Sequence, residues 1–255
     1  MTGMLLCGCC GRMGKAVTAA VAEDPAIEIA AGVDLAPQGD LPYPVVASPA
    51  LLTPEQIEKI DVIVDFSNPS ALGGLLEFAA AHQLPAVICT TGLNEAQQAL
   101  LAQAAKKIPV FFSANMSLGV NLIGVLAEKA AKVLGNSFDI EILEMHHNQK
   151  VDAPSGTALM LAERINAALD APRDYAYDRH DRREKRPKAE IGMHAIRGGT
   201  ITGEHEIIFA GNDEVITISH SARSKALFAT GAVNAAKFLV GRAPGSYSMN
   251  DLLAD

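Results

Sequence analysis

Residues 144–158, with the sequence EMHHNQKVDAPSGTA, hold the densest group of side chains that can do chemistry. His146 and His147 stand next to each other, and Lys150 follows shortly after them. A histidine side chain can donate or accept a proton near neutral pH, and a lysine supplies a positive point charge. This short segment therefore predicts acid–base chemistry on an anionic small molecule.

The same segment ends in a turn that is typical of a helix start. Ser155 is a residue type that caps helices, and the N–H groups of Gly156 and Thr157 would lie in the first turn. Such N–H groups, together with the helix dipole, bind carboxylates, so Ser155, Gly156 and Thr157 are predicted to contact the substrate. The histidine pair could alternatively belong to a metal site, but the sequence has no companion motif such as H-E-x-x-H. We therefore predict no metal.

A glycine-rich motif near the N-terminus predicts a dinucleotide site. Residues 8–14, GCCGRMG, form a G-x-x-G-x-x-G pattern between a predicted strand and a predicted helix. Glycines in this position allow a tight turn and close approach of the pyrophosphate, which binds at the helix N-terminus. A structural turn without a ligand is the alternative. The residues predicted to contact the cofactor here are Gly8, Cys9, Cys10, Gly11, Arg12 and Met13.

Asp34 strengthens the dinucleotide prediction. It comes about twenty residues after the glycine motif, at the end of the next predicted strand, where an acidic side chain accepts the ribose hydroxyls. Its carboxylate would repel a 2′-phosphate, and the neighbouring Leu35 adds no compensating charge. We therefore predict NADH as the preferred cofactor, with NADPH possible. An ordinary loop aspartate is the alternative.

Two further loops follow predicted strands, and ligands collect at the carboxyl ends of such strands. Their small polar residues suit the nicotinamide end of the cofactor, although ordinary turns would have the same composition. The predicted contacts are Cys89, Thr90, Thr91, Ser113, Ala114, Asn115 and Met116.

Short apolar runs alternate with helical patterns in the first half of the chain, which predicts an α/β fold with a Rossmann-type, doubly wound parallel sheet. The predicted strands are Met4–Cys7, Ile27–Val33, Val62–Phe66, Ala86–Cys89 and Val110–Phe112. The predicted helices are Lys15–Ala22, Ser70–His82 and Asn94–Lys106, the last one capped by Asn94.

The second half predicts a separate α+β domain with a mixed or antiparallel sheet. A helix is expected over Gly119–Leu134, with an apolar stripe at Leu122, Leu126, Ala130 and Val133. The other expected elements are a strand from Phe138 to Ile142, a helix from Ser155 to Ala168, strands at Glu206–Ala210 and Glu214–His220, and a helix at Leu227–Val240. Residues 173–188 carry charges of both signs, which indicates a solvated loop and not a nucleic-acid patch.

Composition argues against several classes of partner. The 255-residue chain has a formal net charge of −8, which disfavours nucleic acid and anionic membranes. Its apolar runs are shorter than the roughly 20 residues a bilayer needs, and no secretory signal is visible. The four cysteines have neither disulfide nor zinc-motif spacing, so they are expected to be reduced thiols of a cytoplasmic protein.

The segment E-x-H-H-x-x-K-x-D-A-P-S-G-T-A resembles the signature of the dihydrodipicolinate reductases, also called 4-hydroxy-tetrahydrodipicolinate reductases. The resemblance extends along the whole chain. It includes G-x-x-G-R-M-G at the start, Val64–Ser67, Thr90–Gly92, Ser113–Asn115, Arg197–Gly199, Gly203–His205 and the closing Phe228–Ala232.

This resemblance implies a reaction and a division of roles. The reaction is the reduction of 4-hydroxy-tetrahydrodipicolinate to tetrahydrodipicolinate by NAD(P)H in lysine and diaminopimelate biosynthesis. His146 matches the general acid, Lys150 a catalytic lysine that also meets substrate, and His147 a substrate contact. It also implies a homotetramer whose nucleotide domain spans residues 1–117 and 226–255, with a substrate and oligomerisation domain at 118–225.

Two other functions stay open on the residues alone. One is a different two-domain Rossmann reductase, although aldehyde chemistry would need a cysteine in the second domain, and all four cysteines lie before residue 90. The other is a non-enzymatic NAD sensor, which would need an interaction module such as a basic helix. The chain also departs from the family at Lys225, where arginine is frequent and where a lysine loses the bidentate contact.

Overall fold

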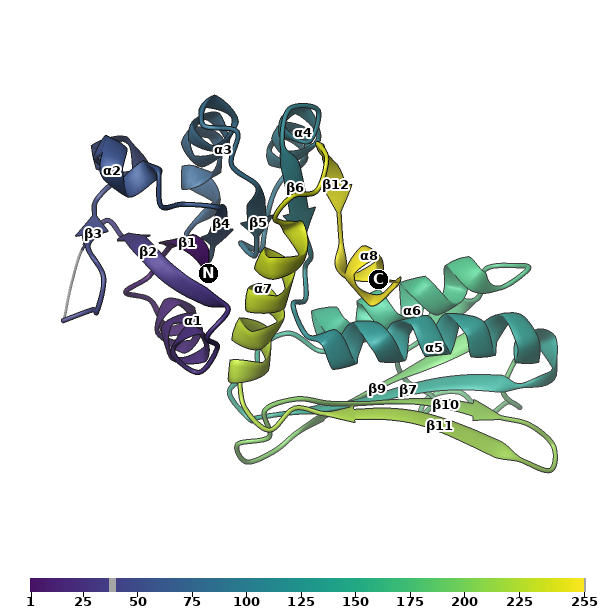
Figure 1. The fold of residues 1–255 in the computed structure, drawn as a ribbon. Helices are drawn as coiled ribbons and strands as arrows, with labels where there is room; N and C mark the ends of the chain where they lie inside the picture. The colour runs from purple at the N-terminus through teal and green to yellow at the C-terminus, as the bar shows by residue number, and fades with distance from the viewer. Residues whose placement is uncertain (37–39, 255) are drawn as a thin grey trace. The chain divides into compact units, whose positions relative to one another are not determined.

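The fold is given by a computed structural model that describes residues 1–36 and 40–254. The chain forms two compact units (Figure 1). The first combines Met1–Leu118 with Ala226–Asp255, and the second is Gly119–Lys225.

The first unit is built on a parallel sheet of seven strands in the order β12-β6-β5-β4-β1-β2-β3. From β3 to β6 this is the Rossmann order, which reverses direction beside β1. The prediction of a doubly wound parallel sheet is confirmed. The strands are β1 (Thr2–Cys7), β2 (Ile27–Val33), β3 (Val45–Val46), β4 (Val62–Asp65), β5 (Ala86–Ile88), β6 (Pro109–Phe112) and β12 (Gly245–Tyr247).

Both faces of this sheet are covered, which explains why β1 is apolar at nearly every position. Met4 and Leu6 point into the core beneath α1 (Arg12–Ala22) and α7 (Ala226–Leu239). Leu5 and Cys7 point into the opposite core, beneath α3 (Leu72–Ala81) and α4 (Glu95–Ala104). Because successive side chains of β1 point to opposite faces of the sheet, this one strand packs against both helical layers.

Helix starts in this unit follow capping chemistry. Asn94 accepts a hydrogen bond from the N–H of Gln97, whose side chain accepts one from the Asn94 N–H, so the predicted cap is confirmed as a capping box. Short helices α2 (Pro54–Ile57) and α8 (Met249–Ala254) complete the unit. Among the described residues, no helix combines the length and apolar character needed to span a bilayer.

The second unit contains a mixed sheet of five strands in the order β11-β10-β7-β9-β8, as predicted. Strand β10 is antiparallel to both its neighbours, whereas β7, β9 and β8 run parallel. The strands are β7 (Asp139–His146), β8 (Asp174–Ala176), β9 (Glu190–Arg197), β10 (Glu204–Ala210) and β11 (Val215–Ser221). Helices α5 (Leu118–Leu134) and α6 (Gly156–Ala168) cover one face of the sheet and form its core (Figure 1).

Helix α5 occurs where the apolar stripe predicted a helix, but three of the four stripe residues are exposed in the structure. Leu122, Leu126 and Val133 are 47%, 43% and 83% exposed. The buried face contains smaller residues such as Ala127 and Ala131, beside Val120, Asn121, Ile123 and Gly124. Small side chains at several of these positions let the helix lie close to the sheet.

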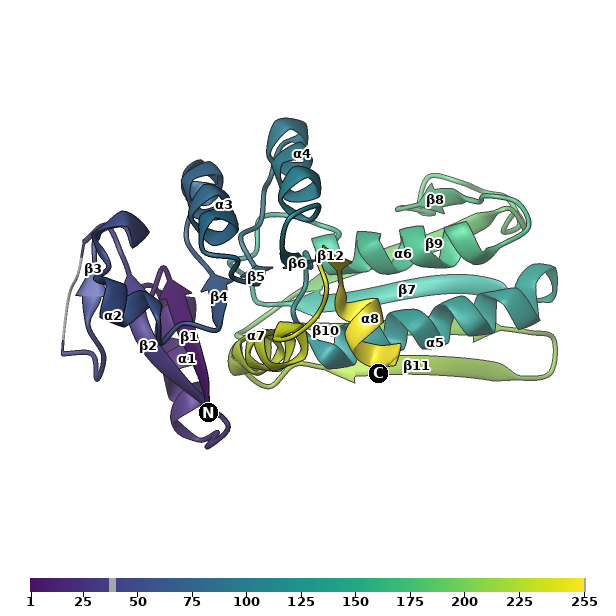
Figure 2. The same cartoon turned by 45° about the horizontal axis from the view of Figure 1, so that its top comes forward.

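The prediction of a solvated loop over residues 173–188 is also wrong in part. The segment contains β8, which pairs with the unpredicted strand β9 (Figure 2). Its arginines Arg179 and Arg186 form ion pairs with Glu141 of β7. Burial alone would raise the pKa of Glu141, but hydrogen bonds from Arg179, His194 and Arg186 lower it to about 2. The charges therefore attach the segment to the sheet.

The packing of α7 in the first unit predicts different outcomes for two glycine-to-alanine changes. A Cβ on Gly231 would lie 1.7 Å from the Met116 carbonyl oxygen, whereas a Cβ on Gly74 in α3 would meet no atom within 4 Å. Gly231→Ala should lower the free energy of unfolding by about 2–3 kcal/mol through overpacking. Gly74→Ala should raise it by up to about 1 kcal/mol through helix propensity. Urea unfolding measures both, and equal effects would contradict this packing.

Candidate active site

The glycine turn links β1 to α1 and is fixed by its backbone. Gly8 has a φ of 76°, in the left-handed region that favours glycine, and its N–H donates to the Val33 carbonyl oxygen at 2.8 Å. A Cβ on Gly14 would lie 2.3 Å from the Gly8 oxygen, so glycine is required there too. Gly11 is the N-cap residue of α1. Because it has no side chain, it offers no side-chain acceptor to the N–H groups of the first turn. This is the arrangement that binds a pyrophosphate.

Asp34 lies beside this turn, at the end of β2. Its Oδ2 accepts a hydrogen bond from the Cys10 N–H at 2.9 Å, which fixes the carboxylate against the turn. Cys10 is half-buried, Arg12 is exposed, and Met13 packs partly against the core. Cys9 is fully buried, and burial raises the pKa of its thiol to about 12. The structure therefore brings the predicted residues of the turn together with Asp34.

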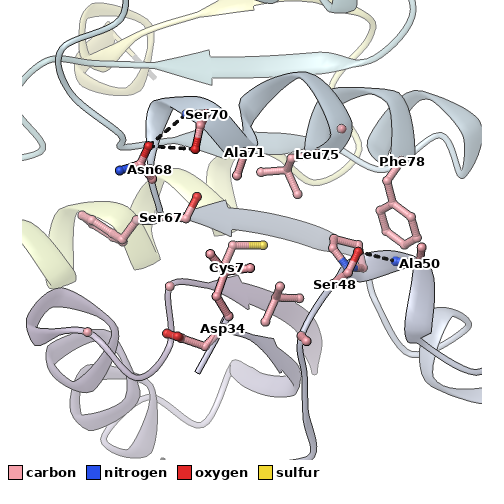
Figure 3. Close-up of a pocket in the computed structure, with 18 residues that line it drawn as sticks. Cys7, Asp34, Ser48, Ala50, Ser67, Asn68, Ser70, Ala71, Leu75 and Phe78 are labelled. Atoms are coloured by element: carbon pink, nitrogen blue, oxygen red, sulfur yellow. Dashed lines mark hydrogen bonds between the residues drawn. The ribbon is translucent and has the colours of Figure 1, made fainter. Parts of the chain in front are cut away.

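A cavity of about 650 Å³ opens beside Asp34, at the carboxyl ends of β1, β2 and β4. Figure 3 shows Asp34 and Cys7 on one side of it and Ala71, Leu75 and Phe78 on the other. The sequence analysis missed most of its lining, including Ala47, Ser48, Pro49, Ala50, Phe66, Ser67, Asn68, Ser70, Ala71, Gly74 and Phe78. The rule that ligands collect at strand ends could have identified Phe66–Asn68, but residues 47–50 carry no motif. The described residues that line the cavity include neither lysine nor arginine.

The two other predicted cofactor loops are organised by local hydrogen bonds. Thr90 is buried and donates to Oδ2 of Asp65 at 2.7 Å, while Ser67 donates to Oδ1 of the same carboxylate at 2.5 Å. Burial raises the pKa of Asp65 despite these bonds. Asp65, which the sequence analysis did not select, thus ties the loop after β4 to the loop after β5.

Side chains in these loops differ widely in exposure. Cys89 and Met116 are buried, so only their backbone can meet a ligand, whereas Thr91 and Ala114 are exposed. The Ser113 hydroxyl donates to the Asn115 carbonyl oxygen at 2.8 Å, which holds the loop after β6 in a turn.

In the second unit, His146 ends β7 and its ring is held by a buried carboxylate. Glu144 is fully buried, and its Oε2 lies 2.5 Å from Nδ1 of His146. Arg197, paired in register with His146 on β9, donates to both Glu144 oxygens at 2.8 and 2.7 Å. Burial raises the pKa of Glu144, but the bonds from Arg197 and His146 outweigh burial and lower it. An ionised Glu144 assigns the proton on Nδ1 of His146, leaving Nε2 for chemistry.

Ser155 and His205 form the other wall around His146. The Ser155 N–H donates to Oε1 of Glu144 at 3.0 Å, and its Oγ accepts from the Ala158 N–H as the N-cap of α6. Nε2 of His205 lies 3.1 Å from that Oγ, and the rings of His205 and His146 meet edge to face at 5.3 Å. Burial and the neighbouring His146 lower the pKa of His205 to about 4, so His205 is neutral.

The remaining predicted substrate residues lie nearby in the chain but are more open. Nζ of Lys150 pairs with Asp152 at 2.9 Å, so an incoming carboxylate must compete with that exposed partner. Gly156, the first residue of α6, is exposed and has open space around its Cα, and Thr157 is half-buried. His147 is half-buried, and its Nδ1 has no hydrogen-bond partner within the described part of the chain. These roles stay predictions.

Together, a Rossmann-order sheet, a glycine turn with an acidic residue at the end of β2, and a second unit with a carboxylate-held histidine define a two-domain oxidoreductase. The model described as "Dihydrodipicolinate reductase, N-terminus" matches residues 2–116, and "Dihydrodipicolinate reductase, C-terminus" matches residues 119–253. The chain therefore belongs to the dihydrodipicolinate reductase family.

Similar proteins agree with this membership. The 4-hydroxy-tetrahydrodipicolinate reductase of Caldanaerobacter subterraneus subsp. tengcongensis is 50% identical over 253 residues, covering 99% of this chain and 98% of that protein. The enzyme of the same name from Clostridium tetani is 44% identical over 253 residues, covering 99% and 97%. In fold, the chain is similar to the dipicolinate-bound dihydrodipicolinate reductase from Paenisporosarcina sp. TG-14, with a TM-score of 0.80, 23% identity and coverage of 98% and 99%.

The environment of His205 predicts how stability depends on pH. The unfolded chain takes up a proton near pH 6.5, whereas folded His205 does so only near pH 4. Stability from neutral His205 is therefore complete above pH about 6.5 and is lost as the pH falls toward 4, by up to about 3 kcal/mol. His205→Gln keeps an amide donor but does not titrate, so its free energy of unfolding should fall less over this range. Parallel pH profiles for the two proteins would contradict the prediction.

Proposed function

We propose that the chain reduces 4-hydroxy-tetrahydrodipicolinate to tetrahydrodipicolinate, using a nicotinamide dinucleotide, as a step of lysine and diaminopimelate biosynthesis. The observation that carries the proposal is the imidazole of His146, held at Nδ1 by Glu144 beside the start of α6. The proposal is also supported by the full-length similarity of the chain to proteins named for this reaction.

The first unit has the residues to hold the cofactor. The glycine turn would take the pyrophosphate, Asp34 the adenosine ribose, and the cavity beside β2 and β4 the adenine. Two observations support the fit of a dinucleotide to this site. A Cβ on Gly8 or Gly14 would collide with backbone atoms, so the turn has no side chain there, and a cavity opens beside Asp34. When bound, the nicotinamide supplies the hydride of the reduction.

In the second unit, His146 is arranged to deliver a proton from Nε2. The Glu144 carboxylate holds Nδ1 and fixes the orientation of the ring, while Arg197 provides that buried carboxylate with a partner. Loss of the substrate hydroxyl as water and reduction of the ring carbon that carried it would leave an enamine. Donation of the Nε2 proton to that enamine would leave a neutral histidine still bonded to Glu144. General acid catalysis of this kind contributes roughly 10²–10⁴-fold to the rate.

The substrate is a dicarboxylate, and the second unit offers two features that bind anions. The first turn of α6 begins at exposed Gly156 with Ser155 as its cap. Hydrogen bonds from Lys150 and from the Gly156 N–H lower the pKa of Asp152, so this helix start already receives a carboxylate, which one substrate carboxylate could replace. The Lys150 ammonium group can release Asp152 and pair with the second carboxylate of the substrate.

Removing either catalytic side chain should separate catalysis from cofactor binding. His146→Ala should lower kcat by about 10²–10⁴-fold with cofactor affinity unchanged. Lys150→Ala should lower kcat and also raise KM, because a binding charge is lost. Steady-state kinetics with dihydrodipicolinate synthase product measures both, with His180→Ala, an exposed histidine, as the control. An unaltered kcat would remove His146 from the mechanism, and tight NADH binding without NADH consumption would favour a sensor.

The cofactor pocket predicts a preference for NADH. A 2′-phosphate would face the Asp34 carboxylate, with exposed Leu35 next to it and no lysine or arginine among the described lining residues. Wild-type kcat/KM should be higher with NADH, and Leu35→Arg should raise the value for NADPH. A wild-type preference for NADPH above about tenfold would reject this assignment.

We also infer a homotetramer in the cytoplasm. Exposed apolar residues of the second sheet support assembly, since Ile196, Val215 and Ile216 are 45%, 63% and 37% exposed. Sedimentation equilibrium tests the assembly, and a monomer would contradict it.

A further inference from the structure

Cys9, Cys10 and Asp34 bring two thiols and a carboxylate together within the glycine turn. The two sulfur atoms lie 3.9 Å apart, and the ligand atoms of all three residues lie within 4.8 Å of one another. The Cys10 N–H bond to Asp34 holds the carboxylate on this side of the turn. None of the roles assigned to the turn above requires sulfur.

These separations are close to those of a tetrahedral metal centre. Zn²⁺ binds thiolate sulfur at about 2.3 Å and carboxylate oxygen at about 2.0–2.2 Å. At tetrahedral angles, two thiolates on one ion stand about 3.8 Å apart, and a thiolate and a carboxylate oxygen about 3.6 Å apart. The two sulfur atoms already have this spacing, and the carboxylate oxygen, within 4.8 Å of both, must move closer to them to close the site.

Burial gives the cluster an inner and an outer side. Cys9 is fully buried among core residues that include Val17 and Tyr43, whereas Cys10 and Asp34 are half-buried and reachable from solvent. An ion can therefore enter on the side of Cys10 and Asp34, with water as its fourth ligand. Soft sulfur ligands select ions such as Zn²⁺ and Co²⁺ against Mg²⁺.

We infer that Cys9, Cys10 and Asp34 form a binding site for a thiophilic divalent cation, and that an ion bound there excludes the dinucleotide. On binding, each coordinating thiol releases its proton to solvent and no electron is transferred. For Cys9, the charge of the bound ion must offset the burial that raises the pKa of this thiol. The exclusion follows because the ion takes the carboxylate that the adenosine ribose needs and occupies the turn that receives the pyrophosphate. This second part rests on the proposed function, whereas the ion site does not.

The ion site is tested by titrating the full-length, reduced protein with Co²⁺, whose thiolate complexes absorb strongly in the near ultraviolet, and then with Zn²⁺. One Co²⁺ per chain should bind with this band, and Zn²⁺ should abolish it. Cys10→Ala, at a half-exposed position, should lose the band, and Asp34→Asn should weaken the affinity by about tenfold or more. Cys7→Ala is the matched control, because Cys7 ends β1 just before the turn but packs in the opposite core, and it should keep the band. A band of wild-type strength in Cys10→Ala would overturn the site.

The exclusion is tested by NADH binding with and without Zn²⁺. Saturating Zn²⁺ should raise the apparent Kd for NADH by at least about tenfold in the wild type, with no effect in Cys10→Ala and none from Mg²⁺. Unchanged NADH affinity in protein that holds one Zn²⁺ would overturn the exclusion. The two proposals can also fail separately. If the protein binds no NADH before metal is added, but shows the Co²⁺ band on titration, the ion site is supported and the proposed function fails.

Discussion

The arrangement of the second unit depends on one buried carboxylate. Glu144 receives hydrogen bonds from Arg197 on β9, from the His146 ring and from the backbone at the start of α6. Burying an ionised carboxylate without partners would lower the stability of the fold by several kcal/mol. The buried Glu144 therefore needs all of these hydrogen bonds. Through them the position of a neighbouring strand and the start of a helix are coupled to the direction of one imidazole ring.

The first unit depends on a constraint of a different kind, which is the absence of side chains. The turn after β1 works because Gly8 adopts a positive φ and Gly14 leaves room for the Gly8 and Cys9 carbonyl oxygens. Backbone N–H groups then face a ligand without a side chain in between. In the second unit, ion pairs fix the positions of charged side chains. In the first unit, the absence of side chains leaves the backbone N–H dipoles of the turn open to a ligand.

Local patterns explain which features could be predicted from the sequence. The glycine turn, the strands around it and the segment from His146 to Thr157 each occupy a short stretch, so spacing alone reveals them. Arg197 and His205 act on His146 from strands about fifty and about sixty residues away, and no spacing rule connects them. The apolar stripe revealed helix α5 but not its buried face, because side-chain size ranks burial poorly where a helix lies close to a sheet. Strand β9 was missed because Gly192 interrupts its pattern, in a place where a Cβ would overlap the Glu141 carboxylate.

Gly203 shows how a residue without a functional group can matter to chemistry. It lies just before β10, and a Cβ there would stand 3.0 Å from Nε2 of His146, the atom assigned to proton donation. Its backbone needs no left-handed conformation, since its φ lies outside that range. A side chain at this position would crowd Nε2, so glycine leaves that nitrogen without a side-chain contact from the start of β10, just as Glu144 supplies one at Nδ1.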